Sequence, residues 1–81
     1  MSNKLTFTKL KKLLINLGFS EITIRKGSHI VFKNPSHDSI IVLPHFSPQR
    51  LVSSRHIAAI RRIIVENNIL DNNKFNQLIS V

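Results

Sequence analysis

The chain has 81 residues, 12 of them Lys or Arg and only four Asp or Glu, so its formal net charge is +8 at pH 7. This length supports one small core and excludes a second, so we predict a single domain over residues 1–81, with its core over about 5–66 and a C-terminal extension over 67–81. The absence of cysteine excludes disulfides, thiolate metal sites and Cys nucleophiles.

The first predicted element is a helix over residues 7–17. Thr6 or Thr8 can cap its start, and Gly18 followed by Phe19 fits a left-handed cap at its end. Lysines interrupt the apolar residues of this opening segment, which therefore lacks the continuous apolar run of a signal peptide or membrane span. We expect a cytoplasmic protein with no membrane partner. The apolar residues with helical spacing are Phe7, Leu10, Leu13, Leu14 and Leu17.

Three short strands are predicted next, over residues 21–26, 29–33 and 39–43. Apolar and polar residues alternate in the first two, and the third is rich in β-branched side chains. Turn-forming residues separate them at 27–28 and 34–38. Strands joined by such short turns form an antiparallel meander.

The rest of the chain predicts a loop over residues 45–52 and a second helix that Ser53 or Ser54 can cap. From Asp71 onward, Phe75, Leu78 and Ile79 have helical spacing, so we expect a short third helix that packs against the body or frays. The resulting fold class is α+β with the order α-β-β-β-α. Its three-stranded antiparallel sheet carries the helices on one face and leaves the other open.

A histidine in the second strand is the main candidate for chemistry. The register that keeps the isoleucines of the first strand on the face of Ile30 pairs Ile24 with Ile30 and sets Arg25 opposite His29. His29 then lies on the open face, with Lys33 on the same strand. An ordinary solvated surface histidine is the alternative.

Histidine exchanges a proton near neutral pH, so His29 could act as general base toward a ribose 2′-hydroxyl or as general acid toward a leaving 5′-oxygen. Arg25, Lys26 and Lys33 are candidates to hold the scissile phosphate and stabilise the charge that builds on it. This set suits RNA cleavage without a metal or another cofactor. His45 is a candidate for a second proton-transfer group, although a structural or solvated imidazole explains it as well.

Two further surfaces concern macromolecular partners. The high net charge is typical of proteins that bind polyanions, with a merely basic soluble protein as the alternative. An apolar strip on the open face, predicted from Val31, Ile41 and Leu43, suits an inhibitory protein. The helix residues that could follow an RNA backbone, or simply be solvated, are Lys9, Lys11, Lys12, Arg61 and Arg62.

The run GFSEITIRKGSHIVFKNPSHDSIIVLPHF resembles the HicA family of toxin ribonucleases. The shared features are a strand, a Gly-Ser-His turn into an apolar strand, and a third strand that ends near a Val-Pro-His element, here Val42-Leu43-Pro44-His45 with one residue inserted. The resemblance extends from the first helix to about Ile64. It implies a fold similar to double-stranded-RNA-binding domains.

The same resemblance implies an endoribonuclease of a type II toxin–antitoxin system that cleaves mRNA, with His29 matching the catalytic histidine. It also implies a HicB-like antitoxin that covers the active site. A non-catalytic RNA-binding module of the same fold is the alternative.

Overall fold

The computed structural model describes residues 5–23, 29–44, 47 and 49–79, and the predicted α+β fold is confirmed. One helix is followed by a three-stranded antiparallel sheet of order β1-β2-β3 and by two further helices. The predicted third helix is therefore present. The elements are α1 (Phe7–Asn16), β1 (Ser20–Thr23), β2 (His29–Asn34), the short 3₁₀ helix η1 (Pro35–His37), β3 (Ser39–Pro44), α2 (Ser54–Glu66) and α3 (Asn72–Ile79).

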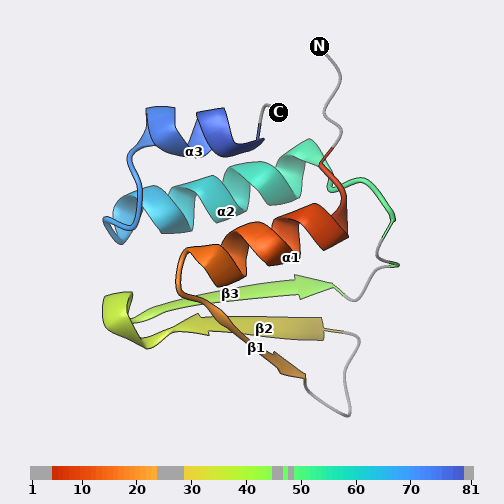
Figure 1. The fold of residues 1–81 in the computed structure, drawn as a ribbon, viewed down its shortest axis with the longest axis horizontal. Helices are drawn as coiled ribbons and strands as arrows, with labels where there is room; N and C mark the ends of the chain where they lie inside the picture. Colours follow the sequence, from red (N-terminus) through yellow and green to blue (C-terminus); the bar gives the residue numbers. More distant parts are fainter. Residues whose placement is uncertain (1–4, 24–28, 45–46, 48, 80–81) are drawn as a thin grey trace.

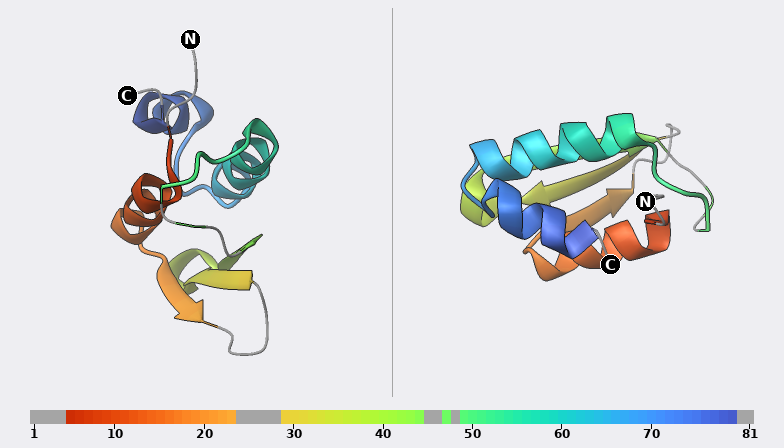
Figure 2. Two further views of the ribbon diagram at one scale, coloured as in Figure 1. Left: turned by 90° about the vertical axis from the view of Figure 1, so that its right-hand side faces the viewer. Right: turned by 90° about the horizontal axis from the view of Figure 1, so that it is seen from above.

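The described elements form three layers (Figure 1). The sheet is the first layer, and α1 and α2 lie side by side on one of its faces, with α1 against β1 and α2 against β3 (Figure 2). The third helix, α3, lies on the side of this helix layer that faces away from the sheet. No described element covers the other face of the sheet, as the sequence predicts.

The ends of α1 are fixed by its neighbours in the sequence. Thr6 accepts a hydrogen bond from the Lys9 backbone N–H at 3.3 Å, so Thr6 rather than Thr8 is the N-cap. At the other end Gly18 has a φ of +101°, and the Phe19 N–H donates to the Leu14 carbonyl at 3.0 Å. The predicted left-handed cap is confirmed, and it turns Phe19 back into the core.

The core lies between the sheet and the helices and also extends to α3. Burying one Val, Leu, Ile or Phe side chain contributes about 1.5–3 kcal/mol. The amphipathic stripes of α1 and α2 both face this core, as their three- and four-residue spacing predicts. Its buried members are Leu5, Leu10, Leu14, Phe19, Phe32, Ile41, Leu43, Val52, Ile57, Ile60, Ile64 and Phe75.

A buried amide joins the sheet to the end of α1. Asn34, the last residue of β2, is almost fully buried, and its Nδ2 donates to the Leu17 carbonyl at 3.1 Å. Its Oδ1 lies 3.4 Å from His37 Nδ1 in η1. Asn34 therefore satisfies a carbonyl that the end of the helix leaves without an intrahelical partner.

The register of β1 on β2 differs by one residue from the prediction. The pairing of Ile24 with Ile30 is wrong, because Thr23 pairs with Ile30 and Ile22 pairs with Val31. A shift of one residue exchanges the two faces of a strand. Ile22 accordingly lies on the uncovered face and is 41% exposed.

A buried aromatic residue and an ion pair explain this register. Phe19 lies between the Gly18 cap of α1 and the first residue of β1, and its burial in the core sets the phase in which the chain enters β1. Two residues later Glu21 lies opposite Phe32, and its carboxylate is 3.2 Å from Lys11 Nζ in α1. The alternation of isoleucines in the sequence reveals neither the burial of Phe19 nor the ion pair between Lys11 and Glu21.

The apolar strip on the uncovered face also differs from the prediction. Ile41 and Leu43 belong to the core under the helices, whereas Ile40 and Val42 are 54% and 55% exposed. The prediction fails because four consecutive apolar residues in β3 show no alternation that would identify the inner face. Pairing with β2 identifies the residues of the uncovered face, and we call this set the apolar patch: Ile22, Val31, Ile40 and Val42.

Candidate active site

The candidate site lies where β2 begins. His29 is the first residue of this central strand, lies opposite Pro44 of β3, and is exposed. The alternate residues Phe32 and Ile30 pack on the core, so strand alternation directs His29 to the uncovered face together with Val31. This is the face that the sequence predicts.

The imidazole of His29 is exposed to solvent. Within the described residues it makes no hydrogen bond and no ion pair. A side chain held by no neighbour can adopt either tautomer and can meet a bound nucleotide from the solvent side.

Of the three predicted phosphate ligands, the structure describes Lys33. Arg25 and Lys26, and the second candidate His45, lie outside the described residues. Lys33 is exposed on the same face as His29, but four residues further along the strand, which is about 13 Å at 3.3 Å per residue. A shared phosphate contact of Lys33 and His29 stays a prediction, and it requires both side chains to lean toward each other along the strand.

The predicted helix cations fall into two groups. Lys9 and Lys12 are exposed on α1. The other three interact with side chains of the protein itself, and so are less available to an RNA backbone. These interactions are Lys11 with Glu21 at 3.2 Å, Arg62 with Glu66 at 3.0 Å, and Arg61 Nη1 donating to Asn76 Oδ1 at 3.0 Å.

The remaining histidines have structural partners. His37 contacts Asn34 in the β2–β3 connection, and His56 Nδ1 lies 2.9 Å from Oγ of Ser53, the N-cap of α2. Neither geometry brings the imidazole to His29. Among the residues that the structure describes, no three His, Asp or Glu side chains group together as a metal site.

Two arginines that the sequence analysis does not single out lie at the end of the molecule where β2 begins. The segment 50–52 pairs with residues 5–7, because the Phe7 N–H donates to the Arg50 carbonyl at 3.0 Å and the Val52 N–H donates to the Leu5 carbonyl at 2.8 Å. Arg50 is thereby placed beside the start of α1. Arg55, in the first turn of α2, is also exposed.

A signal for these arginines exists in the sequence. No Asp or Glu occurs between Asp38 and Glu66, a stretch that contains Arg50 and Arg55. Figures 1 and 2 show that α1 and α2 both begin at the end of the sheet where β2 starts and β3 finishes. The sequence alone does not show that these helices begin at the same end of the sheet as β2.

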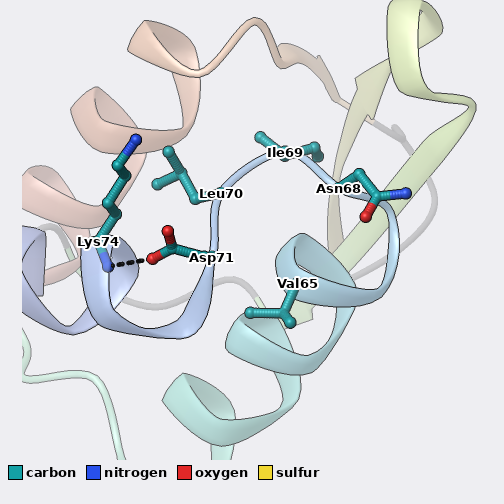
Figure 3. A pocket seen from close by; sticks show the side chains of 6 residues that line it. All are labelled: Val65, Asn68, Ile69, Leu70, Asp71 and Lys74. Carbon is teal, nitrogen blue, oxygen red and sulfur yellow. Dashed lines mark hydrogen bonds between the residues drawn. The ribbon is translucent and has the colours of Figure 1, made fainter.

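A hollow at the opposite end of the molecule does not offer comparable chemistry. It has a volume of about 310 Å³ and lies at the corner between α2 and α3 (Figure 3). Its carboxylate, Asp71, accepts a hydrogen bond from the Lys74 backbone N–H at 2.7 Å and so caps α3. The residues that line the hollow are Val65, Asn68, Ile69, Leu70, Asp71 and Lys74.

Comparison with known proteins identifies a family. Residues 7–63 match the HicA toxin family of bacterial toxin–antitoxin systems. No curated protein and no solved structure matches the chain. None of the described helices is long and apolar enough to cross a membrane. The match covers well over half of the sequence and includes α1, the whole sheet and most of α2, so the chain belongs to the HicA toxin family.

Proposed function

We propose that this HicA-family toxin is an endoribonuclease that cleaves mRNA without a metal ion, with His29 as its general acid or base. The observation that carries the proposal is an exposed imidazole at the start of the central strand, on the face that no described element covers. Membership of a toxin family and a net charge of +8 support RNA as the target.

The proposed reaction begins with attack of a ribose 2′-oxygen on the adjacent phosphorus. His29 takes the 2′-hydroxyl proton as the new P–O bond forms, the bond from phosphorus to the 5′-oxygen breaks, and that oxygen leaves with a proton. A cyclic phosphate and a 5′-hydroxyl are the products. His45 is our candidate to donate the second proton, and Arg25 and Lys26 are our candidates to stabilise the charged phosphorane.

The partner that we propose for the uncovered face is an antitoxin similar to HicB. Ile40 and Val42 are more than half exposed, and they lie on the same face as His29. Exposed apolar side chains gathered around a functional residue are typical of protein-binding sites. An antitoxin seated on the apolar patch would also cover the imidazole, which would explain inhibition by simple occlusion.

Substitution of His29 tests the catalytic proposal. His29→Ala should slow cleavage of a single-stranded RNA by roughly 10²- to 10⁴-fold, because a positioned proton-transfer group contributes about that much. RNA affinity should change little, since phosphate contacts supply most of it. His37→Ala is the matched control, because it removes an exposed imidazole at the other end of β2.

The measurements are the single-turnover cleavage rate, repeated with excess EDTA, and the dissociation constant for an uncleavable RNA analogue. Equal cleavage by the wild-type protein and His29→Ala would remove His29 from the mechanism. Loss of cleavage in EDTA would remove the metal-independent reaction. RNA binding without any cleavage by the wild-type chain would favour the non-catalytic module.

A further inference from the structure

The acidic residues of the chain are all displaced from the end of the molecule that carries His29. There are four in the whole sequence. Glu21 lies near the start of β1, which is the far end of the sheet, and Asp38 follows η1 at that same end. Glu66 ends α2 and Asp71 precedes α3, again at the far end.

The carboxylates neutralise cations near their own end. Glu66 pairs with Arg62 at 3.0 Å, and Glu21 pairs with Lys11 at 3.2 Å. Arg55 is 11 residues before Glu66 in α2, which corresponds to about 16 Å along the helix axis, beyond a Debye length of roughly 8 Å at physiological salt. The structure records no ion pair for Arg55 with any described residue. Its charge is therefore uncompensated.

The backbone adds to the positive potential at the His29 end. Both α1 and α2 begin there, so the positive ends of two helix dipoles lie at the end of the molecule that also carries the exposed residues Arg50 and Arg55. In the view along the long axis of the molecule, the start of α2 lies above the start of β2 and the end of β3 (Figure 2). The start of β2 and the first turn of α2 thus lie at the same end of the molecule, with α2 on the sheet face opposite to that of His29.

We propose that Arg50 and Arg55 bind phosphates of the RNA strand that flank the cleaved bond, so that the strand crosses this end of the molecule instead of following the outer surface of α1 or α2. The inference rests on the proposed function and specifies its substrate-binding surface. The backbone of Arg50 is held beside α1 by the hydrogen bond from Phe7, and that of Arg55 is held in α2, so the separation of the two backbone positions is fixed before RNA binds.

RNA binding by charge-matched variants tests the inference in the full-length His29→Ala protein, which leaves the RNA intact. Arg50→Gln with Arg55→Gln removes two positive charges from the proposed surface. Arg62→Gln with Lys74→Gln removes two from the far end and is the matched control. The probe is a single-stranded oligoribonucleotide, and the readout is the dissociation constant from 0.05 to 0.3 M salt.

Loss of two phosphate contacts should lower the slope of log affinity against log salt by about 1.4, and should weaken binding roughly 10- to 30-fold at 0.1 M salt. The control should change binding less than about twofold. Arg50→Lys with Arg55→Lys should retain the slope, because it keeps both charges. Circular dichroism would check that each variant is folded.

Equal losses in the two double Gln variants would overturn the inference, because net charge alone would then explain binding. A larger loss in Lys9→Gln with Lys12→Gln would overturn the inference in favour of an RNA path along α1. Failure of the parent protein to bind RNA would also overturn the inference. The cleavage rate of the protein that retains His29 is measured in parallel. If that protein does not cut RNA while the arginine effect persists, the catalytic proposal fails and the binding surface stands.

Discussion

The glycine after α1 carries a constraint that no other residue type meets equally well. Gly18 has a φ of +101°, which side chains with a Cβ rarely adopt. A Cβ added there would also lie 3.3 Å from Nδ2 of Asn34, the amide that donates to the Leu17 carbonyl. Backbone conformation and packing therefore both favour glycine at this turn between α1 and the sheet.

We predict that Gly18→Ala lowers the free energy of unfolding by about 1–3 kcal/mol, the usual range for a non-glycine residue held in a sparsely populated region. Gly18→Asn should lose less, because Asn tolerates positive φ better than Ala. Urea unfolding followed by circular dichroism measures both. Equal stability of the Ala variant and the wild-type protein would contradict the account of this turn.

At the scale of elements, α3 completes the core although it lies beyond the segment that matches the family. Its Phe75 side chain is fully buried in the core, and its Asn76 side chain accepts a hydrogen bond from Arg61 of α2. A domain of this size holds a net stability of roughly 3–5 kcal/mol. One aromatic side chain from α3 is therefore a large fraction of what keeps the protein folded.

Phe75→Ala should cost about 3–5 kcal/mol, the range for truncating a buried aromatic residue, and should leave much of the protein unfolded at 25 °C. Leu78→Ala, on the same helix but 46% exposed, is the control and should cost less than about 1 kcal/mol. Thermal melts report both. Phe75→Leu keeps most of the apolar volume and should give an intermediate melting temperature; a melt like that of the wild-type protein in all three would show that α3 is dispensable.

The order and type of the elements follow from the sequence because helical spacing, Gly18 and the Ser53 cap each give a local signal. The strand faces were harder to predict. Phe19, which sets the phase of β1, lies outside the alternating run, and the four apolar residues of β3 have no alternation. The exposed side of His29 was predictable from Ile30 and Phe32. The surface with Arg50 and Arg55 was not, because it depends on which elements begin at the same end.

At the scale of the whole molecule, charge repulsion between copies of the chain opposes self-association, whereas the apolar patch favours it. The net charge of +8 keeps copies of the chain apart in solution, whereas Ile40 and Val42 expose apolar area that favours contact. Salt weakens the repulsion and leaves the apolar attraction in place. The balance should therefore shift with ionic strength.

We predict that the isolated protein is monomeric in 0.05 M salt and self-associates in 0.5 M salt, as measured by sedimentation velocity. Ile40→Thr with Val42→Thr should stay monomeric at both concentrations, because these substitutions keep β-branching and reduce apolar area. Lys74→Gln, on an exposed surface of α3, serves as the control and should behave like the wild-type protein. Association that weakens as salt rises would mean that charge pairing and not the patch drives it.

His29 belongs to the middle strand of three, and this has a consequence for how the toxin can be silenced. A regulator that extended the sheet by lateral strand addition would pair with the outer border of β1 or β3. Such an extension would leave the face of the central strand uncovered, and the imidazole of His29 would remain accessible to a nucleotide. Under the catalytic role that we propose for His29, blocking therefore requires a segment that passes over the broad surface, transverse to the strands.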